Sequence, residues 1–173
     1  MTDELLVVRA QLGERAALAE LVLRWRTPVW TYVRRMLDAE RADDVAQEIW
    51  LAVVRGLPRL REPDRFAPWL FTIARRSITD RLRAEYAEAE AFADVAAVSD
   101  DPAEATVERA ELTAGLSALP VLEREVLVLF YLEDLSVEEC AQVCRVPAGT
   151  IKSRLSRARR LLREQLTEKG WQP

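Results

Sequence analysis

Apolar residues recur at helical spacing along most of the chain. Near the start, one helix face is formed by Leu18, Leu21, Val22 and Trp25, and the pattern resumes after Pro28. Further stripes predict a helix from about Ala42 to Gly56 and another from about Ala67 to Ala84. Two prolines between them indicate a loop from Leu57 to Arg65. The first part of the chain therefore predicts a small helical bundle.

Short helices with clear start signals are predicted in the C-terminal part. Pro120 suits a first helical position, and an apolar helix is expected from Glu123 to Leu132. The segment Ser136-Val-Glu-Glu139 has the spacing of a capping box, which begins another helix. That helix should end near Arg145, and Thr150 is expected to cap a basic helix after it. Two short helices joined by a tight turn are typical of a helix-turn-helix.

The composition agrees with an all-α fold and argues against an enzyme. Only five of the 173 residues are glycine, while alanine, leucine, glutamate and arginine are abundant. Histidine, the commonest general base and zinc ligand, is absent, and we find no phosphate-binding loop or nucleophile elbow. We therefore expect no catalytic residue, no metal site and no cofactor. Cys140 and Cys144, one helical turn apart, are interpreted as small core residues.

Charge divides the chain into three parts. Basic and acidic side chains number 15 and 12 in residues 1–83, one and nine in residues 84–111, and nine and eight in residues 112–173. This distribution predicts two small helical domains, residues 1–84 and 110–173, joined by an acidic flexible linker of residues 85–109. The longest apolar run is too short to span a bilayer and the first residues carry no basic signal region, so a cytoplasmic protein without membrane insertion is expected.

The basic segment from Thr150 to Arg160 is the strongest candidate for a binding surface. On a helical wheel, Ile151, Leu155, Ala158 and Leu162 form one narrow apolar stripe. Serines keep the opposite face slim, so its long cationic side chains can reach phosphates and guanine edges in a major groove. The alternative is a solvated basic face. The candidate DNA-contacting residues are Lys152, Ser153, Arg154, Ser156, Arg157 and Arg160.

Two more helices present candidate surfaces. The helix after Ala67 places Leu70, Ile73, Ala74, Ser77 and Ile78 toward the core, which leaves a cationic outer face of Trp69, Thr72, Arg76, Thr79 and Arg83. Trp69 either stacks on unpaired bases or packs at the end of the bundle. The helix before Gly56 buries Val45, Ile49 and Val53, and its outer face combines charges with apolar side chains, as protein-binding surfaces do. The candidate residues there are Asp44, Gln47, Glu48, Leu51 and Arg55.

In their order and spacing, these motifs resemble those of the extracytoplasmic-function (ECF) sigma factors, a group of bacterial transcription initiation factors. The segments that resemble family region 2 are Asp44-Val-Ala-Gln-Glu-Ile-Trp50, Phe66-Ala-Pro-Trp-Leu-Phe-Thr-Ile-Ala-Arg75 and Asp80-Arg-Leu-Arg83. The segments that resemble region 4 are Leu119-Pro120, Tyr131-Leu-Glu-Asp-Leu-Ser136 and Val146-Pro-Ala-Gly-Thr-Ile-Lys-Ser-Arg154.

The resemblance implies both function and partners. Region 2 would bind the clamp helices of the β′ subunit of core RNA polymerase, through a surface that includes Asp44, Gln47 and Glu48, and would open the minus-10 promoter element. The loop between Leu57 and Phe66 would hold a base flipped out of the duplex. Region 4 would bind the flap of the β subunit and the minus-35 element, with Ser153 and Arg157 facing DNA. Because the chain has no appended zinc-binding anti-sigma motif, an anti-sigma factor would be a separate protein.

Two departures from the family pattern and two rival functions remain. Arg76 stands where the family often has asparagine, which bears on minus-10 preference. Arg145 stands where the turn often has glycine, so either a left-handed arginine carries about 1–2 kcal/mol of strain or the turn has another geometry.

One rival function is that of a stand-alone helix-turn-helix repressor, which leaves residues 1–83 unexplained. The other is a helical adaptor that binds only proteins, which would show no salt-dependent DNA affinity.

Overall fold

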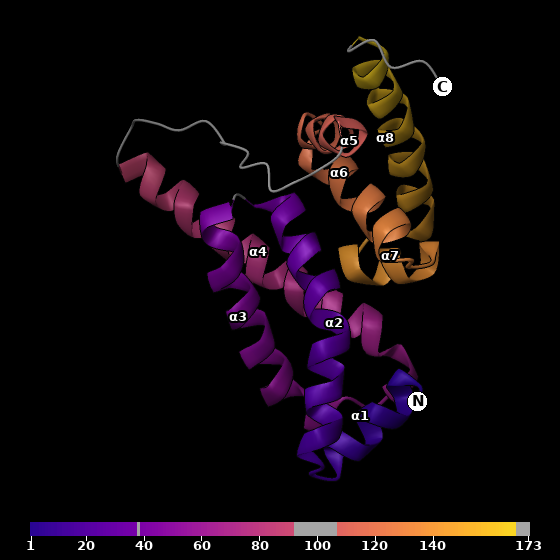
Figure 1. Cartoon of the computed structure of the whole chain (residues 1–173). Coiled ribbons are helices and arrows are strands. Elements are labelled where there is room, and N and C mark those ends of the chain that lie inside the picture. The colour runs from indigo at the N-terminus through magenta and orange to yellow at the C-terminus, as the bar shows by residue number, and fades with distance from the viewer. Residues whose placement is uncertain (38, 92–106, 169–173) are drawn as a thin grey trace. The chain divides into compact units, whose positions relative to one another are not determined.

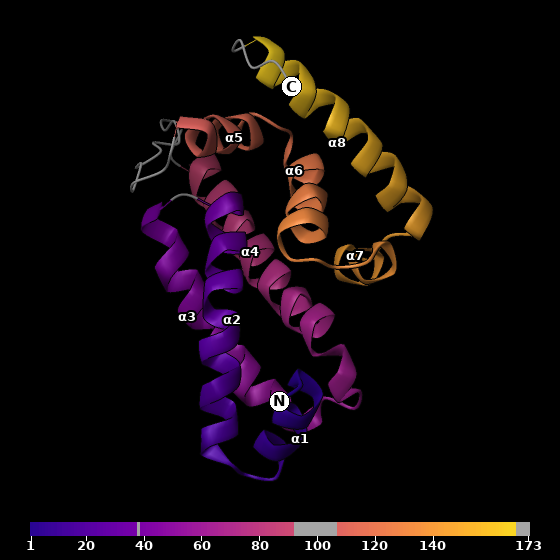
Figure 2. The same ribbon diagram turned by 45° about the vertical axis from the view of Figure 1, so that its right-hand side comes forward.

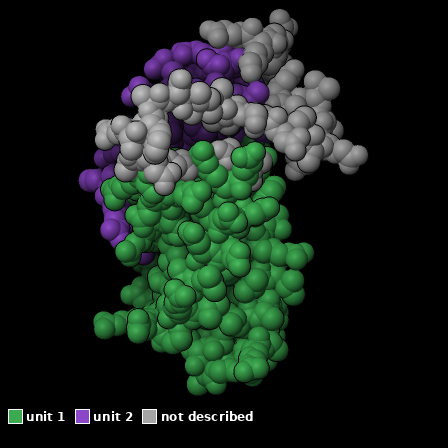
Figure 3. Space-filling model, turned by 90° about the vertical axis from the view of Figure 1, so that its left-hand side faces the viewer, with its two compact units in different colours: residues 1–97 green, residues 98–173 purple. Residues whose placement is uncertain are grey.

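The structure is a computed structural model that describes residues 1–37, 39–91 and 107–168, without the side chains of residues 39, 85–91, 107–111 and 168. Every regular element within these ranges is helical, which confirms the all-α prediction (Figure 1). The chain divides into two compact units, residues 1–97 and 98–173 (Figure 3). Residues 92–106 of the predicted acidic linker lie outside the described residues.

The first unit is a bundle in which three long helices pack against one another. Its elements are α1 (Asp3–Gln11), α2 (Arg15–Met36), α3 (Ala39–Gly56), η1 (Leu57–Arg59), η2 (Pro63–Arg65) and α4 (Phe66–Ala91). Helix α2 packs against α1, α3 and α4, and α3 also packs against α4 (Figures 1 and 2). Helix α4 continues past the predicted end near Ala84 to Ala91, into the segment that was assigned to the linker.

Pro28, after which the apolar pattern resumes, does not interrupt the second helix. It lies inside α2, which runs without interruption from Arg15 to Met36. Proline removes one backbone hydrogen bond and disfavours a helix interior. Buried side chains lie on both sides of it, with Leu21 before it and Val29 and Tyr32 after it. Tertiary packing of this face therefore overrides the local preference.

An aromatic cluster joins α2 to α4. The ring of Tyr32 meets that of Phe71 edge to face at 5.4 Å, and Trp25 lies 6.0 Å from Phe66 and 6.1 Å from Phe71. Phe71 is fully buried, whereas the helical wheel had assigned Ile73 to the core, and Ile73 is only half-buried. These rings pack α2 against α4, and apolar area of this size dominates core energetics.

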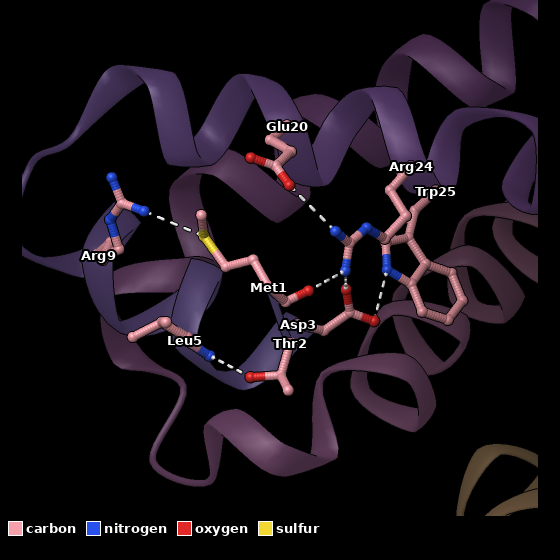
Figure 4. Close-up of polar contacts among 8 residues, drawn as sticks. All are labelled: Met1, Thr2, Asp3, Leu5, Arg9, Glu20, Arg24 and Trp25. Atoms are coloured by element: carbon pink, nitrogen blue, oxygen red, sulfur yellow. Dashed lines mark hydrogen bonds and ion pairs between the residues drawn. The ribbon is translucent and has the colours of Figure 1, made fainter.

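Polar contacts tie the first residues of the chain to α2. Arg24 donates hydrogen bonds to Asp3 at 2.6 Å, to the carbonyl of Met1 at 3.0 Å and to Glu20 at 3.0 Å (Figure 4). The indole of Trp25 donates to the other carboxylate oxygen of Asp3 at 3.1 Å. Asp3 therefore connects α1 to the side of α2 that carries the aromatic cluster.

The second unit is a compact helix-turn-helix domain. Its described elements are α5 (Val107–Ser117), α6 (Val121–Leu127), η3 (Val128–Leu132), α7 (Val137–Cys144) and α8 (Ala148–Glu168). The apolar helix predicted from Glu123 to Leu132 begins at Val121, with Pro120 as its cap, and it ends in a π-helical turn. Helix α8 packs against α5, α6 and α7.

Helix α7 begins with the predicted start signal and ends at a strained residue, in the turn before α8. Both hydrogen bonds of the Ser136–Glu139 capping box are present. Arg145 adopts the left-handed conformation, with φ of 54° and ψ of 46°. The amides of Arg145 and Val146 donate to the carbonyls of Gln142 and Ala141, a Schellman pattern that satisfies the helix end and offsets the strain. Helix α8 begins at Ala148, so the prediction that Thr150 caps it was wrong.

The two cysteines are buried, as predicted, and both are free thiols. Burial and the nearby carboxylates of Glu139 and Glu125 raise the pKa of the Cys140 thiol to about 12. A thiol with such a pKa is almost entirely protonated near neutrality, and the thiolate is the reactive form. Cys140 therefore acts as a small core residue.

Candidate DNA-binding and protein-binding surfaces

The outer face of α8 carries cations and serines above a buried apolar stripe. Ile151, Leu155 and Ala158 are buried and Leu162 is half-buried, close to the predicted stripe. The following five candidate residues are exposed: Lys152, Ser153, Ser156, Arg157 and Arg160. Because α8 packs on α5, α6 and α7 through the other side, this face is available to a partner of the second unit.

Arg154 differs from the other candidate residues of this helix. It is half-buried, and its Nη1 atom is buried without a hydrogen-bond partner within the described part of the chain. On the wheel, residue 154 lies beside the apolar stripe rather than opposite it. The aliphatic part of Arg154 therefore covers the edge of the core, and a contact between its guanidinium and DNA stays a prediction.

Three arginines of α8 are held by different kinds of partner. Arg160 pairs with Glu164 of the same helix at 2.8 Å, and both side chains are exposed. Arg159 donates to the hydroxyl of Tyr131 at 3.4 Å. Arg157 lies 3.4 Å from Glu123, a buried carboxylate of α6. The wheel predicted that these arginines are on the surface, but it could not show that Arg157 and Arg159 meet partners from other elements.

The outer face of α4 is less exposed than the wheel predicted. Trp69 is half-buried, and its ring centroid lies 5.9 Å from that of Phe66. A Cβ atom on Gly56 would lie 2.9 Å from the ring of Trp69, so the close approach of α3 and α4 requires glycine there. The hydroxyls of Thr72 and Thr79 donate to backbone carbonyls one turn earlier, at 2.7 and 2.8 Å. Packing at the bundle end therefore occupies much of the Trp69 ring.

Cations remain exposed along α4 and in the loop before it. Arg76 is exposed and lies 3.7 Å from Asp80, and Arg83 is exposed as well. In the loop, Arg59 and Arg61 are exposed. The backbone of the loop accepts hydrogen bonds from a side chain of α1. The side-chain amide of Gln11 donates to the carbonyls of residues 57 and 60 at 2.9 and 2.8 Å. Two hydrogen bonds therefore tie the loop to α1.

The outer face of α3 combines charges with exposed apolar side chains, as predicted. Val45, Ile49 and Val53 are buried against the bundle. Leu51 is 50% exposed and Val54 is 46% exposed, although both are fully apolar. Around them lie the exposed polar candidates Asp44, Gln47, Glu48 and Arg55. An apolar centre with a charged rim is the anatomy of a protein-binding surface.

A tryptophan that sequence analysis did not single out lies at the border of this face. Trp30 of α2 is 44% exposed, and its indole donates to Asp43 of α3 at 2.8 Å. The guanidinium of Arg34 lies 5.6 Å from the ring centroid, within cation–π range. Asp43 precedes Gln47 by one helical turn, so Trp30 lies next to the predicted α3 surface. In the sequence, Trp30 and Arg34 are four residues apart, and this spacing could have indicated a ring and a cation on one helix face.

Two other kinds of site are absent from the described part of the chain. No group of three or more histidine, cysteine, aspartate or glutamate side chains is arranged to hold a metal ion among the residues that the structure describes. Within the same ranges, no helix is both long and apolar enough to cross a membrane.

Comparison with protein families and known proteins shows which family this chain resembles. Residues 21–87 match the model of Sigma-70 region 2, and residues 109–162 match that of Sigma-70, region 4. The ECF RNA polymerase sigma factor SigC of Mycobacterium tuberculosis (strain CDC 1551 / Oshkosh) is 32% identical over 162 residues, which cover 89% of this chain and 85% of that protein. The ECF RNA polymerase sigma-E factor of Escherichia coli (strain K12) is 30% identical over 174 residues, covering 92% and 91%.

Solved structures show the same likeness. The sigma factor RpoE from Bartonella quintana, determined in complex with the anti-sigma factor NepR, matches with a TM-score of 0.80 and 25% identity over 86% of this chain and 96% of that chain. CnrH, determined in complex with the cytosolic domain of CnrY, matches with a TM-score of 0.71 and 25% identity over 96% and 97%. With both sigma-70 regions present in order and full-length relatives at this identity, the chain belongs to the ECF family of RNA polymerase sigma factors.

Proposed function

We propose that the exposed face of α8 contacts the minus-35 promoter element, and that the face of α3 binds the clamp helices of the β′ subunit. The observation that carries the proposal is the separation of the two faces of α8. Its apolar stripe is buried under α6 and α7, while Lys152, Ser153, Ser156 and Arg157 remain exposed after a helix-turn-helix turn. A helix with this arrangement can enter the major groove with its cations toward phosphates and guanine edges.

The α3 surface fits a protein partner better than DNA. Leu51 and Val54 gain free energy when they are removed from water, by about 25 cal/mol per Å². Asp44 and Glu48 repel phosphate and attract a cationic surface. A cationic helical surface with apolar side chains would complement both properties, and we propose that the clamp helices present such a surface.

The minus-10 element is assigned to α4 together with the loop before it. Arg59, Arg61 and Arg83 are exposed and can contact the phosphates of an opened strand. The loop is fixed by Gln11, which reduces the entropy lost when an unpaired base is held there. Trp69 offers only part of its ring, so we assign Thr72, Arg76 and Thr79 a larger share of the contact surface than stacking on Trp69.

Partners and location complete the proposal. The flap of the β subunit would bind the second unit, and a separate anti-sigma factor would inhibit the protein, as NepR forms a complex with RpoE. The protein would act in the cytoplasm as a specificity factor and not as an enzyme. Its boundaries would follow the charge pattern, with domains at residues 1–84 and 110–173 and a linker at 85–109.

The test is transcription in vitro with purified core RNA polymerase and a promoter library. Transcripts from a defined subset of promoters, dependent on added protein, are expected. Specific DNA binding by the protein alone, with no transcript when core enzyme is added, would indicate a repressor instead. Binding to core enzyme without any salt-dependent DNA affinity would indicate a helical adaptor.

A further inference from the structure

The pairing of Arg157 with Glu123 is unlike the other arginine contacts of α8. The carboxylate of Glu123 is 8% exposed, whereas the Arg157 side chain is 62% exposed, and the two lie 3.4 Å apart. By contrast, both members of the Arg160–Glu164 pair are exposed and lie on one helix. An exposed pair of that kind is weak and is easily released to water or phosphate. A buried carboxylate that loses its partner is left uncompensated in a poorly solvated position.

Position in the fold adds to this difference. Glu123 lies in the first turn of α6, which packs along α8. Residues 157 and 159 are separated by about 200° on a helix, so their side chains leave α8 on opposite flanks. Arg159 reaches Tyr131 on one flank, and Arg157 reaches Glu123 on the other. The two arginines are thus restrained from two neighbouring elements, α6 and η3.

We propose that Glu123 is a positioning residue that orients the Arg157 guanidinium for base recognition in the minus-35 element. The inference rests on the proposed role of α8. A carboxylate accepts from one edge of the planar guanidinium, and the remaining N–H groups can then donate as a pair to the N7 and O6 acceptors of guanine. An unrestrained arginine on the same face would bind any nearby phosphate equally well.

The same carboxylate also works against indiscriminate binding. Its negative charge beneath the DNA-facing surface reduces the attraction of Arg157 for the phosphate backbone. Specificity is a difference between two affinities, and lowering non-specific affinity raises it. Glu123 therefore contributes twice, by directing the donors and by weakening binding to the wrong sequences.

A neighbouring residue provides a matched control. Glu125 lies on the same helix, is also buried, and has its carboxylate 3.7 Å from the Cys144 sulfur. Glu125→Gln removes the same charge from the same helix without removing the contact to Arg157. A general effect of buried charge in α6 would appear in both variants, whereas orientation of Arg157 would be lost only in Glu123→Gln.

The experiment uses the full chain bound to core RNA polymerase. Wild-type protein first selects its preferred minus-35 sequence from a randomised duplex, and affinities are then measured for that sequence and for each single base-pair substitution. For Glu123→Gln we expect discrimination at one base pair to fall by about fivefold or more, with tighter binding to scrambled duplexes. Glu125→Gln should keep the wild-type discrimination. In an Arg157→Ala background, Glu123→Gln should cause no further loss.

A second variant of Glu123 separates its role in orienting Arg157 from an effect on folding. Glu123→Asp keeps the buried charge but shortens the side chain, and we expect it to lose discrimination without tighter binding to scrambled duplexes. If Glu123→Gln and Glu123→Asp fold and discriminate as wild type does, or if both fail to fold by circular dichroism, the role is structural and the inference is wrong. If Arg157→Ala itself leaves discrimination intact, the proposed base contact of α8 fails instead.

Discussion

The outer faces of α3 and α8 differ in the kind of side chain that they leave in water. On α3, Leu51 and Val54 are about half exposed between carboxylates and an arginine. On the side of α8 that we propose contacts DNA, the exposed side chains from 152 to 160 are cations and serines, and the apolar ones are buried. The first face gains free energy by excluding water, and the second gains it by displacing counterions from phosphate. Two amphipathic helices of one chain are therefore suited to different partners.

The interiors of the two units differ as well. In the described part of the first unit, the buried side chains are apolar apart from the Tyr32 hydroxyl. The second unit buries Glu123 and Glu125, and burial together with the charge of Asp134 raises the pKa of Glu133 to about 8. The raised pKa of Glu133 makes the stability of the second unit depend on pH. We therefore expect pH to affect the second unit more than the first.

Reversing charge on α3 should cause the largest loss of binding affinity. Asp44→Lys combined with Glu48→Lys should weaken association with core RNA polymerase by about a hundredfold or more, because like charges facing a cationic partner cost several kcal/mol. Affinity is measured with labelled protein, and circular dichroism should show unchanged helical content. Glu4→Lys, an exposed position on α1, is the control. Wild-type affinity of the double variant would assign the polymerase contact to another surface.

Removing one cation from α8 should have the next largest effect. Arg157→Ala should weaken binding of the polymerase complex to the minus-35 element by about 1–3 kcal/mol and relax the preference at one base pair. Arg159→Ala should instead weaken all sequences alike and flatten the salt dependence. Binding to native and scrambled elements is compared over a range of salt concentrations. Equal losses on all sequences for both variants would contradict a base contact by Arg157.

A smaller change tests the apolar character of the α3 face. Leu51→Ala should weaken association with core polymerase by about 1 kcal/mol, because only part of an already half-exposed side chain is transferred from water. The loss should persist at high salt, unlike the effects of the α8 variants. Leu12→Ala, at a more exposed leucine that follows the last residue of α1, should leave the affinity unchanged. A Leu51 effect that disappears with salt would contradict the proposed apolar contact.

The last expected effect concerns stability and pH rather than binding. Glu133 has an ordinary pKa of 4.5, which the fold raises to about 8, so between these values the folded state binds more protons than the unfolded chain. Stability should therefore fall as pH rises from about 5 to about 8. Glu133→Gln should make this fall shallower. Thermal unfolding of the full chain at several pH values measures it, and an identical pH dependence in both proteins would show that Glu133 is not responsible.

The sequence by itself determined which helix faces are buried and where local signals start a helix. The stripes through Val45 and Ile49, and through Ile151 and Leu155, needed only helical periodicity, and the exposed faces followed from them. The Ser136–Glu139 capping box also depends on a local spacing. Such features involve residues within one or two turns of each other, so they can be read without knowing the rest of the fold.

Tertiary structure decided the features that depend on residues distant in sequence. Packing on both sides of Pro28 keeps α2 continuous, and contact with Gly56 withdraws part of Trp69 from water. Arg157 was predicted on the surface, but its buried partner Glu123 comes from another helix. A helical wheel gives the direction of a side chain and not the element that it meets, because that contact is set by how the helices pack.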